Sequence, residues 1–159
     1  MIHALYPGSF DPLHHGHLDI IRRSSRVYDR LTVAVVGNPL KSSNLTLEKR
    51  LEVIREATAD LGNVKVETFS GLLVDYVQQR GVQVVVKSLR GALDFEYEAQ
   101  MAHLNRLLNP DAETVFMLAA PEWSFVSSTR VRELFGLGAD VSTLVPAASL
   151  DALASENPG

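Results

Sequence analysis

The 159-residue chain contains no cysteine, a single tryptophan and only 7% aromatic residues. The lack of cysteine excludes disulfides, thiolate catalysis and cysteine-ligated metals, and it suits a reducing cytoplasm. No apolar run approaches the roughly 20 residues of a membrane-spanning helix, and the first residues lack the basic and apolar regions of a signal peptide. We therefore expect a cytoplasmic protein that has no membrane partner.

A basic surface and the common glycine-rich phosphate loops are also missing. The net charge of -4 argues against nucleic acid as a partner, because affinity for a phosphate backbone needs a basic surface. Neither a Gly-x-x-x-x-Gly-Lys-Ser/Thr loop nor a Gly-x-Gly-x-x-Gly turn follows the first expected strand, which argues against P-loop hydrolases and dinucleotide dehydrogenases. The length and the 46% apolar content predict one globular domain over residues 1–159, with a tail that frays from about residue 156.

Short β-branched runs alternate with amphipathic segments along the chain. This alternation predicts the α/β class, as a Rossmann-like doubly wound sheet of five parallel strands with helices on both faces. The expected strands are Ile2 to Tyr6, Leu31 to Val36, Val64 to Thr68, Val82 to Lys87 and Thr114 to Leu118. Ligands bind at the carboxyl ends of the strands in such sheets, so we expect the site residues where strands give way to helices.

The helices are predicted from apolar spacing and from residues that begin or end helices. The first expected helix follows Gly16 and has Leu18, Ile21 and Tyr28 at helical spacing. Thr46 is expected to cap the second helix, and Gly81 is expected to end the third. The helices after the first are expected at Leu47 to Ala57, Leu72 to Arg80, Asp94 to Leu108, Arg130 to Phe135 and Ala147 to Ser155. In the fourth of these helices Tyr97, Met101, Leu104 and Leu108 share one side. Either Ser127 or Ser128 is expected to cap the fifth.

The most informative segment runs from Tyr6 to His17, directly after the first expected strand. Small residues here let a ligand approach the backbone, and a helix N-terminus is a favourable place for phosphate oxygens. His14 and His17 are three residues apart and are able to donate hydrogen bonds to an anion. The same spacing suits metal ligation, but no third ligand set is evident, so anion binding is preferred. The plainer alternative is that both histidines only decorate a turn.

Two motifs carry a resemblance to a known family. Gly8-Ser9-Phe10-Asp11-Pro12 followed by His14-His15-Gly16-His17 resembles the signature of the HxGH nucleotidyltransferase superfamily, and Ser127-Ser128-Thr129-Arg130 matches its second, serine-rich signature. Within the superfamily the sequence is most similar to bacterial phosphopantetheine adenylyltransferases, from Leu5 to about Pro146. Further stretches support this: Thr46 to Arg50, Leu89-Arg90 with Asp94 to Glu98, and Glu122 to Ser128.

The resemblance implies a role for individual positions. His17 corresponds to the histidine that acts in the transition state, Ser9 to a residue that touches both substrates, and Lys41 to the lysine that contacts the phosphate of phosphopantetheine. Leu73 and Lys87 correspond to residues that line the site of the same substrate. The ATP-binding positions are Ser9, Phe10, His17, Ser88, Leu89, Arg90, Glu98, Trp123, Ser124, Phe125, Val126, Ser127, Ser128 and Thr129. The catalytic set is His17, Lys41, Ser9 and Arg90.

One departure and several plainer interpretations accompany these assignments. The family usually has Arg or Lys followed by Gly where this chain has Lys87-Ser88. Lys41, Lys87 and Arg90 are alternatively solvated surface charges. The serines near position 127 are alternatively a helix cap and nothing more.

The implied activity is transfer of AMP from ATP to 4'-phosphopantetheine, which gives dephospho-coenzyme A and pyrophosphate by direct in-line attack. The resemblance also implies magnesium (Mg2+) held mainly through the ATP phosphates, coenzyme A as a feedback inhibitor, and a homohexamer. Two alternatives stay open: a related nucleotidyltransferase with another phosphorylated acceptor, and a nucleotide-binding module without turnover.

Overall fold

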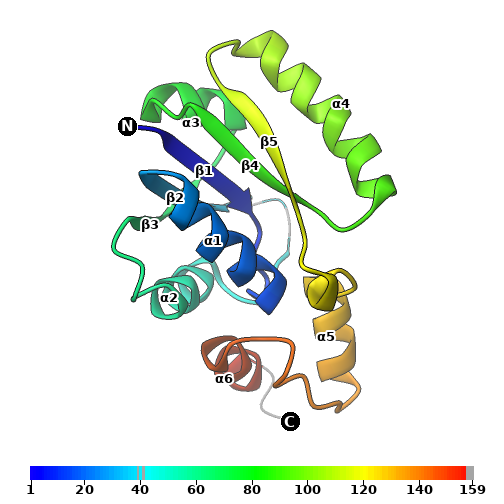
Figure 1. The fold of residues 1–159 in the computed structure, drawn as a ribbon. Coiled ribbons are helices and arrows are strands. Elements are labelled where there is room, and N and C mark those ends of the chain that lie inside the picture. The colour runs from blue at the N-terminus through cyan, green and yellow to red at the C-terminus, as the bar shows by residue number, and fades with distance from the viewer. Residues whose placement is uncertain (39, 41, 157–159) are drawn as a thin grey trace.

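The computed structural model describes residues 1–38, 40 and 42–156, and it contains five parallel strands in one sheet (Figure 1). The strands are β1 (His3–Gly8), β2 (Arg30–Val36), β3 (Val64–Phe69), β4 (Val84–Leu89) and β5 (Glu113–Leu118). Their order is β3-β2-β1-β4-β5, and every pairing is parallel. The predicted α/β class and the five-stranded parallel sheet are therefore confirmed.

Strand β1 lies at the centre of the sheet and extends further than the sequence indicated. Its ladder with β2 runs from His3 opposite Arg30 to Gly8 opposite Val35, so the strand ends at Gly8, where Tyr6 was predicted. Strand β4 likewise spans Val84–Leu89, whereas Val82 to Lys87 was predicted. Both shifts come from pairing with neighbouring strands, which sets where a strand ends and is not visible in a local pattern.

The helices lie close to the predicted segments. They are α1 (His15–Val27), α2 (Leu47–Ala57), α3 (Leu73–Arg80), α4 (Ala92–Leu108), α5 (Ser128–Gly136) and α6 (Ala147–Glu156), with a short 3-10 turn, η1 (Pro121–Trp123), that was not predicted. Thr46 caps α2, and Ser127, one of the two candidates, caps α5. Helix α4 begins at Ala92, two residues before the predicted Asp94, and Asp94 lies within its first turn. None of the helices in the described ranges is long and apolar enough to cross a membrane.

Helices cover both faces of the sheet, as predicted. Side chains of α1, α2 and α6, such as Ile20, Ile54 and Ala152, pack with Val33 and Val86 on one face. Helix α3 packs on the other face against Leu5, Ala34 and Val85. Helix α4 lies beside β4 and β5, with the Phe95 ring 5.7 Å from the Phe116 ring (Figure 1).

Helix α4 is the least covered helix, since none of its residues is buried. Its predicted apolar side is exposed, with 66% of Tyr97, 38% of Met101, 54% of Leu104 and 65% of Leu108 accessible. An amphipathic helix normally buries its apolar side against another element. In the single chain this side has no such cover.

The C-terminal segment forms a third apolar cluster and supports the loop that follows β1. Val126, Val131 and Leu153 are buried in this cluster together with Val141 and Val145. The buried Ser149 hydroxyl of α6 donates a hydrogen bond to the carbonyl of Leu13 (2.7 Å), and the His15 amide donates to the carbonyl of Leu144 (2.9 Å). Residues from the two ends of the chain thus fix the start of α1.

Ser149→Ala is expected to lower the free energy of unfolding by about 1–3 kcal/mol, because it leaves the buried Leu13 carbonyl without its donor. Urea unfolding followed by circular dichroism measures this loss. Ser155→Ala, on the exposed end of the same helix, is the control and should change stability by less than about 0.5 kcal/mol. Equal effects of the two substitutions would show that the Ser149 bond does not contribute.

Candidate active site

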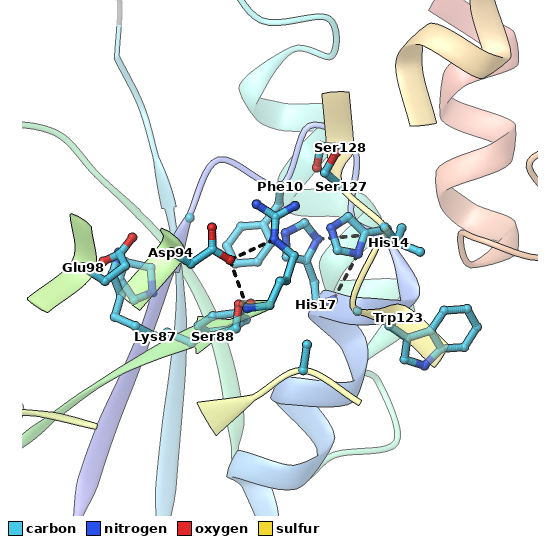
Figure 2. A pocket seen from close by; sticks show the side chains of 17 residues that line it. Phe10, His14, His17, Lys87, Ser88, Asp94, Glu98, Trp123, Ser127 and Ser128 are labelled. Carbon is cyan, nitrogen blue, oxygen red and sulfur yellow. Dashed lines mark hydrogen bonds and ion pairs between the residues drawn. The ribbon is translucent and has the colours of Figure 1, made fainter. Parts of the chain in front are cut away.

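A cavity beside the predicted motifs opens where the strand order reverses, between the carboxyl ends of β1 and β4. Sheets of this topology bind ligands in the crevice at that point. The cavity has a volume of about 300 Å³. It is lined by Tyr6, Pro7, Gly8, Phe10, His14, Gly16, His17, Lys87, Ser88, Arg90, Asp94, Glu98, Ala119, Trp123, Val126, Ser127 and Ser128. Figure 2 shows the two histidines side by side between the residues of β4 and α4 and those around the start of α5.

The loop between β1 and α1 is held by contacts from two other parts of the chain. Phe10 has a φ of +49°, an unusual conformation for a residue with a side chain, and it is only 2% exposed. The Asp11 carboxylate accepts hydrogen bonds from the amides of Asn44 and Leu45, both at 2.8 Å. Arg132 of α5 donates to the Asp11 carbonyl. The loop is therefore fixed to the segment before α2 and to α5.

His14 and His17 cap the start of α1 reciprocally. The His14 amide donates to Nδ1 of His17 (3.1 Å), and the His17 amide donates to Nδ1 of His14 (3.3 Å). The two rings are stacked with their centroids 3.6 Å apart. Because each Nδ1 is an acceptor, the proton of each neutral ring must be on Nε2. Both rings therefore present an Nε2–H donor at the N-terminus of a helix, where anions are favoured.

Gly16 is required by this arrangement. A Cβ atom at position 16 would lie 2.8 Å from Cε1 of His14, which is closer than packed carbon atoms approach. In the sequence, Gly16 was interpreted as one of the small residues that leave room for a ligand at the helix N-terminus. The structure shows that its first role is to leave room for the His14 ring.

Both histidines are held in the neutral form. Burial lowers the pKa of His14 to about 4, with smaller contributions from the charges of Arg90 and His15. Burial also lowers the pKa of His17 well below its ordinary value, assisted by the nearby His14 and Arg90. Near neutral pH the two rings are thus uncharged hydrogen-bond donors, and the positive charge of the cavity comes from other residues.

The basic side chains of β4 and its following turn are paired with acids of α4. The Asp94 carboxylate is 3.2 Å from Nε of Arg90 and accepts from the Arg90 amide at 3.0 Å. Nζ of Lys87 is 3.4 Å from the Glu98 carboxylate. These pairs bring two cations and two anions into the lining of the cavity, and Figure 2 shows Lys87, Asp94 and Glu98 together on one side of it.

The opposite wall is formed by the start of α5. The Ser127 hydroxyl accepts from the Arg130 amide (3.2 Å), and the Ser128 hydroxyl donates to the carbonyl of Pro12 (2.8 Å). Ser127 is therefore a cap and also lines the cavity, so the two interpretations of this motif are compatible. The ring of Trp123 lies 5.1 Å from the ring of His15.

Comparison with known proteins agrees with the motifs. The cytidylyltransferase-like family matches residues 5–134. A phosphopantetheine adenylyltransferase of Deinococcus radiodurans is 50% identical over 154 residues, which cover 96% of this chain and 92% of the relative. Those of Clostridium kluyveri and Rubrobacter xylanophilus are 49% and 52% identical, over 92% and 90% of this chain and 89% and 87% of the relatives.

The chain belongs to the phosphopantetheine adenylyltransferase family. The match covers both signatures and the five strands, so the cavity lies within the part of the chain that the family shares.

Some of the site residues that the family resemblance implies line the cavity, and others do not. Those that line the cavity are Phe10, His17, Lys87, Ser88, Arg90, Glu98, Trp123, Val126, Ser127 and Ser128. Those that do not line it are Ser9, Leu73, Leu89, Ser124, Phe125 and Thr129. Lys41 lies outside the described residues. Of the tail that was predicted to fray from about residue 156, Glu156 is the last residue of α6, and residues 157–159 lie outside the described residues. The roles of all these residues stay predictions.

The residues outside the cavity have other surroundings. Ser9 is exposed, and its carbonyl points to Arg50 of α2. Leu89 is buried, whereas Phe125 is 66% exposed. Leu73, at the start of α3, packs against the cluster around Phe69 and Val77 on the other face of the sheet.

Asp94 lines the cavity but was not among the predicted site residues. Its position four residues after Arg90 is the signal that was available, because opposite charges at this spacing often pair. In the described part of the chain, no group of three or more acids and histidines is placed to hold a metal.

The lowered pKa of His14 predicts a dependence of stability on pH. Above the ordinary value of 6.5, position 14 is neutral in both the folded and the unfolded chain. Between 6.5 and about 4 the unfolded chain binds a proton that the folded chain does not, so stability falls as the pH falls. His14→Asn supplies a capping oxygen in place of Nδ1 and removes the titration.

The free energy of unfolding of the unmodified protein should therefore fall by roughly 3 kcal/mol more than that of His14→Asn between about pH 7 and pH 4. Urea unfolding at a series of pH values measures the difference. Parallel pH profiles for the two proteins would contradict a buried, neutral imidazole at position 14.

Proposed function

We propose that the chain transfers AMP from ATP to 4'-phosphopantetheine and so forms dephospho-coenzyme A and pyrophosphate. The observation that carries the proposal is the pair of neutral imidazoles with fixed Nε2–H donors at the start of α1, in a cavity that also contains Arg90 and Lys87. Relatives of that name, at 49–52% identity over most of the chain, support the choice of substrates.

The cavity offers donors suited to a triphosphate. The N-termini of α1 and α5 both meet it, and each supplies backbone N–H groups and a favourable dipole. Arg90 is paired with Asp94, and we propose that it turns part of its guanidinium to the phosphates when ATP binds. Asp94 still holds the Arg90 amide, so the backbone stays in place.

The proposed chemistry needs no nucleophile from the protein. An oxygen of the 4'-phosphate attacks the α-phosphorus of ATP, the bond from that phosphorus to the bridging oxygen breaks, and pyrophosphate leaves with the electron pair. The attacking phosphate is already anionic, so no strong general base is required. Catalysis consists of positioning two anions and of stabilising charge on the transferring group and on pyrophosphate.

His17 is well placed for this task because its ring is neutral. A neutral Nε2–H donates a hydrogen bond without requiring that a charged ring be buried. Its orientation is fixed before the substrates bind, through the Nδ1 contact with the His14 amide. A donor that is fixed in advance does not have to reorganise as charge develops.

Magnesium is proposed to enter with ATP. The cavity carboxylates of Asp94 and Glu98 are already paired with Arg90 and Lys87, which fits an ion held mainly by phosphate oxygens and water. Bound in this way, the ion would reduce the negative charge of the triphosphate.

The acceptor side of the proposal rests on the family positions Ser9, Lys41, Leu73 and Lys87. Of these, Lys87 lines the cavity. The Asn44 and Leu45 amides donate hydrogen bonds to the Asp11 carboxylate, which holds this segment close to the loop between β1 and α1. We extend the proposal to coenzyme A as a feedback inhibitor and to a cytoplasmic location. The net charge of -4 gives no reason to propose nucleic acid as a partner.

A pyrophosphate-release assay with ATP and magnesium tests the proposal directly. We expect release with 4'-phosphopantetheine and little with nicotinamide mononucleotide or glycerol phosphate. Release with another acceptor instead would favour a related nucleotidyltransferase. Saturable ATP binding without release would favour a module that has no turnover.

His17→Ala should reduce kcat by roughly 10²- to 10³-fold with a smaller change in ATP affinity, because one preorganised donor is lost. Turnover is measured by pyrophosphate release and affinity by calorimetry with ATP. His15→Ala, two residues away and outside the cavity, is the control and should retain its turnover. Unchanged turnover of the His17 variant would refute its role.

We also propose that the chain forms the homohexamer that the family resemblance implies, with the exposed apolar side of α4 in a contact between copies. Leu104, on that side, is 54% exposed. Leu104→Glu should then lower the mass measured by light scattering. Leu137→Glu, at the 86% exposed residue after α5, is the control. A monomeric mass for the unmodified protein would contradict the proposal.

A further inference from the structure

Arg50 of α2 is a buried cation with incomplete pairing. It is 6% exposed, and its Nη1 donates to the Ser9 carbonyl (2.8 Å) and, at 3.4 Å, to the Val36 carbonyl. Its Nε has no hydrogen-bond partner, and no carboxylate of the described residues forms an ion pair with it. Burying a charge without a counter-charge is costly. A contribution to stability alone therefore does not explain why a cation is buried at this position.

The Ser9–Phe10 peptide, which Arg50 contacts, lies next to the cavity, although Ser9 itself does not line it. Gly8 and Phe10 on either side of Ser9 both line the cavity. The peptide is trans, so its N–H points opposite to its carbonyl. The Arg50 bond draws the carbonyl toward α2, and the Phe10 N–H therefore points away from α2. In the described part of the chain this N–H donates no hydrogen bond.

We propose that Arg50 is a positioning residue that fixes the Ser9–Phe10 peptide so that the Phe10 N–H is presented to an anion in the cavity. The positive φ of Phe10 makes the peptide strained, and a strained backbone keeps its conformation only when its surroundings hold it. Successive N–H groups in a left-handed turn form a concave anion site. Arg50 also adds positive charge directly behind this peptide.

The inference rests on the proposed function in one respect, namely that the anion is the polyphosphate of ATP. Arg50 acts from behind the loop and does not line the cavity, so it is not a catalytic residue. Replacement of Arg50 should therefore affect stability and ligand binding differently. Stability should change little, because relief of the buried charge offsets the loss of the hydrogen bonds to the Ser9 and Val36 carbonyls. Phosphate binding and turnover should decrease.

The test compares Arg50→Met with Arg55→Met, a change of the same kind at an exposed position of the same helix. We expect Arg50→Met to unfold at about the same urea concentration as the unmodified protein, and to lose about 10²-fold in kcat/KM for ATP. Arg55→Met should match the unmodified protein in both. Arg50→Lys, which restores a cation and a donor, should recover part of the activity.

A second measurement does not depend on turnover. Inorganic pyrophosphate is titrated into labelled protein, and the amide resonance of Phe10 is followed by NMR. The Phe10 resonance should move in the unmodified protein and in Arg55→Met, and it should move much less in Arg50→Met. If Arg50→Met does not fold, Arg50→Lys provides the same comparison, with an intermediate shift expected.

The two proposals fail in different ways. If the unmodified protein releases no pyrophosphate from ATP but its Phe10 resonance responds to pyrophosphate through Arg50, the proposed function is wrong and the inference stands. If the unmodified protein is active and the Arg50 variants keep both its kcat/KM and its Phe10 response, the inference is wrong. A loss of stability in Arg50→Met with unchanged kcat/KM would also overturn it, because it would make Arg50 a structural residue only.

Discussion

The reciprocal hydrogen bonds between His14 and His17 are the interaction on which the site depends. Each amide donates to the Nδ1 of the other residue, and this contact begins α1, stacks the two rings and leaves both Nε2–H groups as donors. A single contact therefore sets the helix start, the tautomers and the direction of the donors. Gly16 is part of the same constraint, since any side chain there would displace the His14 ring.

The rest of the molecule keeps this contact in place from several sides. Ser149 holds the Leu13 carbonyl, Arg132 and the Asn44 and Leu45 amides hold Asp11, and Arg50 holds the Ser9 carbonyl. These supports come from α6, α5, the segment before α2, and α2 itself. They explain why a loop with a strained residue at Phe10 adopts one conformation. A site that must bind a flexible, highly charged ligand gains from such preorganisation because less order has to be imposed on binding.

Charge in the cavity is divided between two kinds of residue. The imidazoles are neutral because burial and the Arg90 charge lower their pKa, and they contribute directional hydrogen bonds. Arg90 and Lys87 contribute charge, which Asp94 and Glu98 partly balance before a ligand arrives. A triphosphate bound as proposed would meet cations that are already ordered by their ion pairs. It also leaves both carboxylates paired, which is why magnesium is proposed to be held mainly by the phosphates of the nucleotide.

Much of the fold and part of the site could be predicted from the sequence, for identifiable reasons. The alternation of β-branched and amphipathic runs, the Thr46 and Ser127 caps and Gly81 are local signals, so they determined the strands and helices to within a few residues. The motif from Gly8 to His17 likewise determined the family, because its chemistry is contiguous in the chain. Tertiary structure alone decided that Arg50 and Ser149 support the loop after β1, that Asp94 joins the cavity, and that Ser9, Leu73 and Phe125 lie outside it. Those relations depend on strand order, register and packing between residues far apart in the chain, which no local pattern records.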